Sequence, residues 1–358
     1  MIGAGRADHQ VMSIRRAAPA IGLFFLSPLV AEFLLGDFTV AQLPFLFLLA
    51  PAYGGAAILI REVTRRSGRG WPTMVLLALA YGVVEEGLET QSLFNPDYLD
   101  AHLLDRGFVP ALGISVPWTI FVLTIHTIWS MSVPIALVEE WGDRRETPWL
   151  RRPGLVVAAV LALAGAAGTF AVSYFPDRFM AHPAQLIVAG VVALGLIVAG
   201  FRLRRSGLVP GPAVTAGPAA PPAVWVLVVA LGAGVLLEIP DHVPAALGVA
   251  LLVVVLSGFT VLMVRWSARA GWDGRHRLAA AGGGLLTYAW HSFLTHPVVG
   301  GSGALILVSH VVFALAAVVL LGFEARRVRA RYGELWSRRA TPDGLAHDGA
   351  GRKSGNLL

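Results

Sequence analysis

The chain has 358 residues, of which 56% are hydrophobic and only 14% charged. This composition is too apolar for a soluble domain, and the chain is too long for a single membrane anchor, so we expect an all-α, polytopic bundle of transmembrane helices. The sequence contains no cysteine. Disulfides and thiolate metal sites are therefore excluded, and any metal would need histidine and carboxylate ligands.

Stretches of about 20 apolar residues, the length a helix needs to cross a bilayer, recur along the chain. The first contains Pro28 and Glu32 and is followed by no small-residue cleavage site, so we interpret it as a membrane helix and not a signal peptide. About ten spans are predicted in all: 18–36, 41–60, 72–94, 116–138, 154–175, 184–201, 223–239, 243–264, 278–296 and 303–323.

The distribution of basic residues predicts the orientation of these spans. Of the 28 Lys and Arg, only Arg106 and Arg178 fall in loops expected on the outer side. By the positive-inside rule both termini of this multi-pass protein of the cell membrane are expected to be cytoplasmic, and the even number of spans, which puts both termini on one side, agrees. The net charge of +6 then indicates attraction to membrane lipids, and we expect no nucleic-acid partner.

The spans divide into two unequal groups around a segment rich in Pro, Gly and Ala. We expect a cytoplasmic N-terminus (1–17), a six-span half (18–205), a flexible cytoplasmic linker (206–222), a four-span half (223–323) and a basic, partly disordered cytoplasmic tail (324–358). Small residues, "GAAG" in the fifth span and "AAAGGG" in the ninth, should allow close helix packing.

The third span carries three carboxylates in "AYGVVEEGLETQSLFNP", namely Glu85, Glu86 and Glu89. Burying such groups in hydrocarbon is costly, so they are candidates for function. Glu85 lies about 15 Å below the outer end of its span, and His126 lies about 13 Å below the start of the fourth. His291 of the ninth span lies about 9 Å down, near the level of Glu89. These groups are therefore predicted to meet in the outer half of the membrane.

Helical phase assigns the polar residues to stripes. Glu85 and Glu89 share one face, whereas Glu86 points about 100° away from them. The other polar residues expected on these stripes are Ser92 beside Glu85 and Glu89, Thr90 beside Glu86, Ser130 beside His126, and Thr287 and Thr295 beside His291.

One carboxylate and two imidazoles, with a fourth position open for water, form a familiar ligand set for a hydrolytic zinc. Glu86, His126 and His291 would supply these ligands, and Glu85 would be the general base. Secondary candidates for such a site are Glu89, His310, Ser130 and Thr295.

Simpler interpretations apply to the isolated polar residues. A single buried histidine such as His296 or His310 more often joins helices through hydrogen bonds than binds a metal. Glu32 lies near the end of its predicted span, where snorkelling towards the interface is the ordinary behaviour.

Adjacent glutamates on one helix and single histidines on two later helices resemble the CAAX-protease and bacteriocin-processing (CPBP, Abi) superfamily of intramembrane proteases, with its PrsW-type relatives. The resemblance implies catalytic roles for Glu85, Glu86, His126 and His291. The chain has Thr90, Val122 and Thr295 where these motifs have Arg, Phe and Asn. The flanking segments also resemble uncharacterised multi-span bacterial membrane proteins.

Three functions are compatible with these patterns. The first is an intramembrane hydrolase or protease, metal-dependent or using a glutamate, that acts on a membrane-embedded or outer-face substrate. The second is a proton-coupled transporter or channel that uses the same residues as a relay. No internal repeat is evident, which argues against a transporter. The third is a non-catalytic membrane scaffold.

Overall fold

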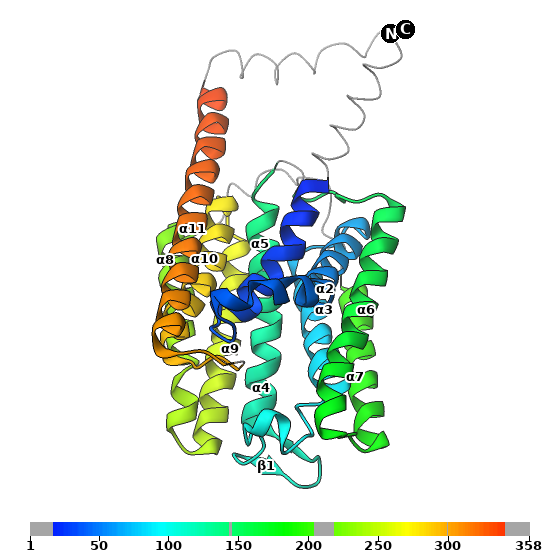
Figure 1. Ribbon diagram of the computed structural model, residues 1–358. Helices are drawn as coiled ribbons and strands as arrows, with labels where there is room; N and C mark the ends of the chain where they lie inside the picture. Colours follow the sequence, from blue (N-terminus) through cyan, green and yellow to red (C-terminus); the bar gives the residue numbers. More distant parts are fainter. Residues whose placement is uncertain (1–16, 143–144, 204–217, 299, 341–358) are drawn as a thin grey trace.

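The computed structural model describes residues 17–142, 145–203, 218–298 and 300–340, and these residues form a bundle of helices (Figure 1). The first half begins with a helix over Ala17–Leu34, whose last turns form η1 (Leu29–Leu34). It continues with η2 (Val40–Phe45), α2 (Leu46–Arg66), α3 (Trp71–Val84), η3 (Glu85–Glu89), η4 (Tyr98–Asp100), α4 (Val116–Ile125), η5 (His126–Ser132), α5 (Val133–Glu139), α6 (Arg152–Asp177) and α7 (Pro183–Arg202).

The second half contains α8 (Ala223–Leu236), η6 (Ile239–His242), α9 (Ala245–Ser267), α10 (Gly274–His291), η7 (Ser292–Leu294) and α11 (Gly303–Ala340). A two-stranded antiparallel hairpin, β1 (Phe108–Val109) and β2 (Ile114–Ser115), stands at the end of the bundle where α3 connects to α4 (Figure 1). The predicted N-terminal segment up to residue 16, most of the predicted linker and the tail from residue 341 lie outside the described residues.

Seven of the described helices are long and apolar enough to cross a membrane. They are Ala17–Leu34, Val40–Arg66, Val116–Glu139, Arg152–Pro176, Pro183–Arg202, Ala245–Ser267 and Gly303–Tyr332. The other three predicted spans coincide with α3 and η3, α8, and α10. These are shorter or more polar, because η3 carries three glutamates, α8 has 14 residues and α10 carries two arginines near its start.

Small residues bring neighbouring helices into backbone contact, as the sequence predicted. Gly165 of α6 faces the backbone of Ala52 on α2, where a Cβ atom would overlap it. In the same way, Gly283 of α10 lies against Ala230 of α8. Close approach of this kind strengthens van der Waals packing between helices that gain no hydrophobic driving force in lipid.

The continuous helix formed by α4, η5 and α5 lies between two packed regions. Met131 and Ile135 belong to the core that includes α2 and α3, whereas Trp129, Val133 and Leu137 belong to the core that includes α10. This helix, which we call the central helix, therefore forms a wall shared by both halves of the chain.

Three of the described helices contain π-helical turns, in which backbone hydrogen bonds join residues five apart. Asp37 N donates to Glu32 O (3.0 Å) after η1, and Thr90 N donates to Glu85 O (2.8 Å) after η3. At η5, Pro134 has no N–H to offer Ser130 O, which instead accepts a hydrogen bond from Ser27 Oγ (2.5 Å). Such turns are frequent at functional sites.

The connection between Ala17–Leu34 and α2 turns part-way along the bundle, well above β1 (Figure 1). It packs against the connection between α10 and α11, since Thr295 Oγ1 donates to Leu35 O (3.1 Å) and Val298 N donates to Asp37 O (3.1 Å). The hydrogen bonds satisfy backbone groups that lipid could not.

Buried ion pairs join the helix ends at the arginine-rich end of the bundle. The fully buried Arg61 contacts Glu62 (2.7 Å) and Glu139 (3.1 Å) and lies 3.6 Å above the Trp149 ring. Arg65 forms a second contact to Glu139, at 2.6 Å. Both carboxylates are thus paired with a cation, which offsets the cost of burying them. This network of ion pairs was not predicted from the sequence.

Candidate functional site

His126, at the start of η5, lies between two glutamates of η3. Its Nε2 atom is 2.7 Å from Glu86 Oε1, and its Nδ1 atom is 2.9 Å from Glu85 Oε2. All three side chains are buried. The structure thus brings together the three residues whose meeting was predicted from depth along the third and fourth spans.

Neighbouring hydroxyl groups fix this geometry. Glu86 Oε2 accepts hydrogen bonds from Thr90 Oγ1 (3.1 Å) and from Ser92 Oγ. Trp118 Nε1 in turn donates to Ser92 Oγ (3.2 Å), and Ser130 Oγ lies 3.2 Å from His126 Nδ1. These contacts hold the carboxylate and the imidazole in one orientation, as outer partners do for ligating side chains in metal sites.

Two more carboxyl groups lie close by. Tyr53 donates a hydrogen bond to Glu32 Oε1 from α2, and its ring stacks on His126 with a centroid separation of 6.2 Å. Glu85, Glu86 and His126 are the charged neighbours of both Glu32 and Glu89. Glu32 therefore does not snorkel towards an interface. Glu32, Glu85, Glu86, Glu89 and His126 together form what we call the glutamate–histidine cluster.

The cluster has more negative groups than its imidazole can balance. Four carboxyl groups surround a single histidine, whose ring also lies against that of Tyr81 with 6.1 Å between centroids, and Glu89 Oε2 is buried without a hydrogen-bond partner among the described residues. Uncompensated carboxylates are costly in a low-dielectric interior, so they require bound protons or a cation. Orphaned buried oxygens are the features expected where a water or an ion belongs.

The donor set fits a divalent cation. One ligand atom from each of Glu85, Glu86 and His126 lies within 4.8 Å of the other two, which makes this the group of described residues suited to hold a metal. Carboxylate oxygens and an imidazole nitrogen suit zinc and the harder divalent ions.

Comparison with known families agrees with the membrane architecture. A family model described as "uncharacterized membrane protein family" matches residues 23–332. The matched region covers most of the chain and the whole cluster, and it leaves out only the start of the first described helix and the end of α11. The chain belongs to this uncharacterised membrane protein family. No curated protein and no solved structure matches it. The match shows no link to the CAAX-protease superfamily, so that resemblance stays a prediction.

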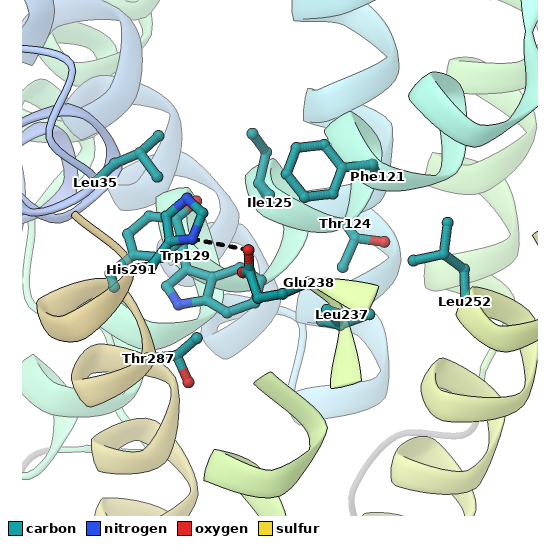
Figure 2. A pocket seen from close by; sticks show the side chains of 11 residues that line it. Leu35, Phe121, Thr124, Ile125, Trp129, Leu237, Glu238, Leu252, Thr287 and His291 are labelled. Atoms are coloured by element: carbon teal, nitrogen blue, oxygen red, sulfur yellow. Dashed lines mark ion pairs between the residues drawn. The ribbon is translucent and has the colours of Figure 1, made fainter. Parts of the chain in front are cut away.

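In this family member, His291 lies away from the cluster. Its Nδ1 atom is 3.0 Å from Glu238 Oε2, at the end of α8 (Figure 2). The expected ligand set of Glu86, His126 and His291 is therefore not assembled. The reason is the central helix: α10 packs on the face that carries Trp129, whose ring stacks on Tyr288 at 4.7 Å.

Of the secondary candidates, two belong to the cluster or contact it and two lie away from it. Glu89 and Ser130 belong to the cluster or contact it. Thr295 bonds to Leu35 O, and His310 packs against Phe293 with its Nε2 atom buried and without a hydrogen-bond partner. Thr295 thus holds the connection between α10 and α11 against the end of η1.

Helical phase misassigned one pair of residues in this family member. Regular helical phase turns Glu85 and Glu86 about 100° apart, yet both reach His126. It also placed Ser92 with Glu85, whereas Ser92 bonds to Glu86. The π-helical turn of η3 changes the angle per residue, so a period of 3.6 fails there.

Three participants were not predicted: Tyr53, Tyr81 and Glu238. A tyrosine within an apolar helix that must satisfy its hydroxyl group could have indicated the first two. Glu238 lies at the end of the seventh predicted span, and nothing in its local sequence indicates His291 as its partner.

Proposed function

We propose that this protein is a membrane-embedded, metal-dependent hydrolase whose reactive centre is the glutamate–histidine cluster. The observation that supports this most is the convergence of ligand atoms from Glu85, Glu86 and His126 within 4.8 Å, inside a buried cluster with surplus carboxyl groups. Zinc is the cation that best combines such ligands with hydrolysis, and when bound it supplies a water whose pKa is lowered towards neutrality.

The remaining groups of the cluster have definite roles in this proposal. Thr90 and Ser92 hold Glu86 through its Oε2 atom, which leaves Oε1 directed at the imidazole. Glu89 Oε2 is buried and without a partner, so it is the carboxylate positioned to accept a proton from the attacking water. The substrate would be membrane-embedded or approach from the outer face.

Metal analysis of the purified protein tests the centre. We expect about one zinc per chain in the wild type after reconstitution, loss of that metal in Glu86→Gln and His126→Asn, and retention in the control Glu238→Gln. A wild-type protein that binds no more metal than Glu86→Gln would refute the metal centre. Hydrolysis of a panel of quenched peptides and chromogenic esters, abolished in Glu86→Gln, would then establish the activity.

A second function, a proton-coupled transporter or channel, is favoured by a different observation. Both ring nitrogens of His126 already lie within 3 Å of carboxylate oxygens, as in a proton relay. The connection after η1 also turns part-way along the bundle near Glu32, and transporters use such interrupted helices at their binding sites. Proton flux into proteoliposomes, abolished by Glu85→Gln without any hydrolysis, would identify this function.

The proposal includes the full topology: ten crossings in the cell membrane, with both termini cytoplasmic. It is supported by Arg61, Arg65, Arg202 and Arg277, which all lie at helix ends that the positive-inside rule assigns to the cytoplasm. A scaffold without chemistry, the third alternative, would show unchanged cellular function in Glu86→Gln.

A further inference from the structure

A second polar site lies on the other face of the central helix. Glu238 and His291 meet in a small, partly enclosed pocket between α4, α8, α9 and α10 (Figure 2). Phe121, Trp129 and Tyr288 supply aromatic walls. We call this space the Glu238 pocket. It shares no residue with the glutamate–histidine cluster.

The polar groups that face the pocket are mainly hydrogen-bond acceptors. Thr124 Oγ1 donates its proton to Ile120 O (2.6 Å) and Thr287 Oγ1 donates to Gly283 O (2.9 Å), so each hydroxyl offers only lone pairs. Trp129 uses its single donor on Gly284 O (2.7 Å). Glu238 adds a carboxylate, which only accepts when ionised. A ligand that supplies N–H donors can therefore bond to Glu238 and to both threonine hydroxyls.

The charge and the walls restrict the ligand further. Glu238 offers carboxylate oxygens to a cationic N–H donor, and aromatic faces attract cations. The space between the side chains admits only small groups. We propose that the Glu238 pocket binds ammonium or a short primary ammonium ion, with its N–H groups directed at Glu238 and the two threonine hydroxyls. This site is independent of the proposed hydrolase.

Binding of radiolabelled methylammonium to the purified full-length protein in nanodiscs tests the proposal. We expect saturable binding by the wild type, at least tenfold weaker binding by Glu238→Gln, and a smaller loss in Thr124→Val, which keeps the shape but removes an acceptor. The control Glu146→Gln removes an exposed carboxylate and should bind as the wild type does.

Competition separates N–H recognition from simple charge attraction. Unlabelled methylammonium should displace the label, whereas tetramethylammonium, which has no N–H group, should not. The proposal is refuted by absence of wild-type binding, by equal binding in Glu238→Gln, or by equal competition from tetramethylammonium. Should Glu238→Gln fail to fold, Thr124→Val and the competition decide. Glu86→Gln should lose metal but keep full methylammonium binding, so the experiments test the proposed metal centre and the Glu238 pocket independently.

Discussion

At the scale of single residues, His126 is the group around which the site is organised. Its two nitrogens face two carboxylates, and each carboxylate lies on the adjacent π-helical turn. Because Glu86 also accepts hydrogen bonds from two hydroxyl groups, it is the most firmly oriented carboxylate of the cluster and the first candidate for an oxygen ligand in the proposed metal centre. The neighbours of Glu86 should therefore influence metal binding even though they contact no metal.

Replacing Thr90 with valine removes one of those hydroxyl groups at nearly constant volume. We expect the zinc affinity of Thr90→Val to fall about 10- to 100-fold, because outer partners orient the ligating carboxylate. Competition with a fluorescent chelator measures this. Thr119→Val is the matched control, since Thr119 Oγ1 donates to Ser115 O on α4, away from Glu86. Equal affinities of the two variants would contradict the assigned role of Thr90.

A second residue-scale prediction concerns Asp273, the N-cap of α10 outside the membrane. Although partial burial acts in the opposite direction, hydrogen bonds and the charge of Arg275 lower the pKa of Asp273 below its ordinary value of 3.8. A lowered folded-state pKa stabilises the fold above pH 3.8, and that contribution disappears as the pH falls through the folded-state value.

The variant Asp273→Asn isolates this effect because asparagine keeps the capping oxygen but loses the charge. We expect the free energy of unfolding to fall by about 0.5 kcal/mol at pH 7 and the difference from wild type to shrink below pH 4. Unfolding in SDS at several pH values gives the comparison. A stability difference that grows on acidification would contradict a lowered pKa of Asp273 in the folded state.

At the scale of elements, the helix pairs α2–α6 and α8–α10 depend on glycines that admit a neighbouring backbone. Gly165 and Gly168 both lie on α6, one turn apart. Only the first has a neighbour, since a Cβ atom on Gly165 would overlap Ala52, whereas nothing lies within 4 Å of one on Gly168.

This difference gives an internal control on one helix. We expect Gly165→Ala to lower the free energy of unfolding by about 1–3 kcal/mol, because an added methyl group overpacks a tight contact. Gly168→Ala should be neutral or slightly stabilising, since alanine favours helix over glycine. Thermal unfolding in detergent measures both. Similar effects of the two substitutions would mean that α2 and α6 do not pack through Gly165.

Sequence patterns predicted much at this scale, and their failures have physical causes. Counting residues from the predicted ends of the third and fourth spans put Glu85 and His126 at about the same level, which agrees with their contact, because rise per residue is nearly constant. The same counting could not place His291, since depth does not specify which face of a bundle a helix occupies. The pairing of Arg61 with Glu139 likewise depends on contacts between residues 78 positions apart.

At the scale of the whole molecule, the described residues form one bundle in which the central helix contacts both halves. Membrane insertion and helical architecture followed from composition alone, because only helices satisfy their backbone within a lipid-exposed segment. The orientation rests on arginine placement. Because the chain has no native cysteine, this orientation can be tested by labelling single introduced cysteines.

Single cysteines in two loops provide the test of orientation. Asp105 lies in the loop before β1 with its side chain 74% exposed, and Glu146 lies between α5 and α6 with its side chain 62% exposed. We expect a membrane-impermeant maleimide added to intact cells to label Asp105→Cys but not Glu146→Cys, which should react only after lysis. Labelling of Glu146→Cys in intact cells would invert the proposed topology.

The three π-helical turns that carry Glu32, the η3 glutamates and His126 have a consequence for comparing homologues. Each such turn accommodates one more residue than an α-helical turn of the same span. A homologue that had lost the chemistry could delete a single residue from each helix and restore regular hydrogen bonding. If the proposed function is right, isolated one-residue gaps at η1, η3 and η5 should therefore accompany loss of the glutamates in homologues that lack it.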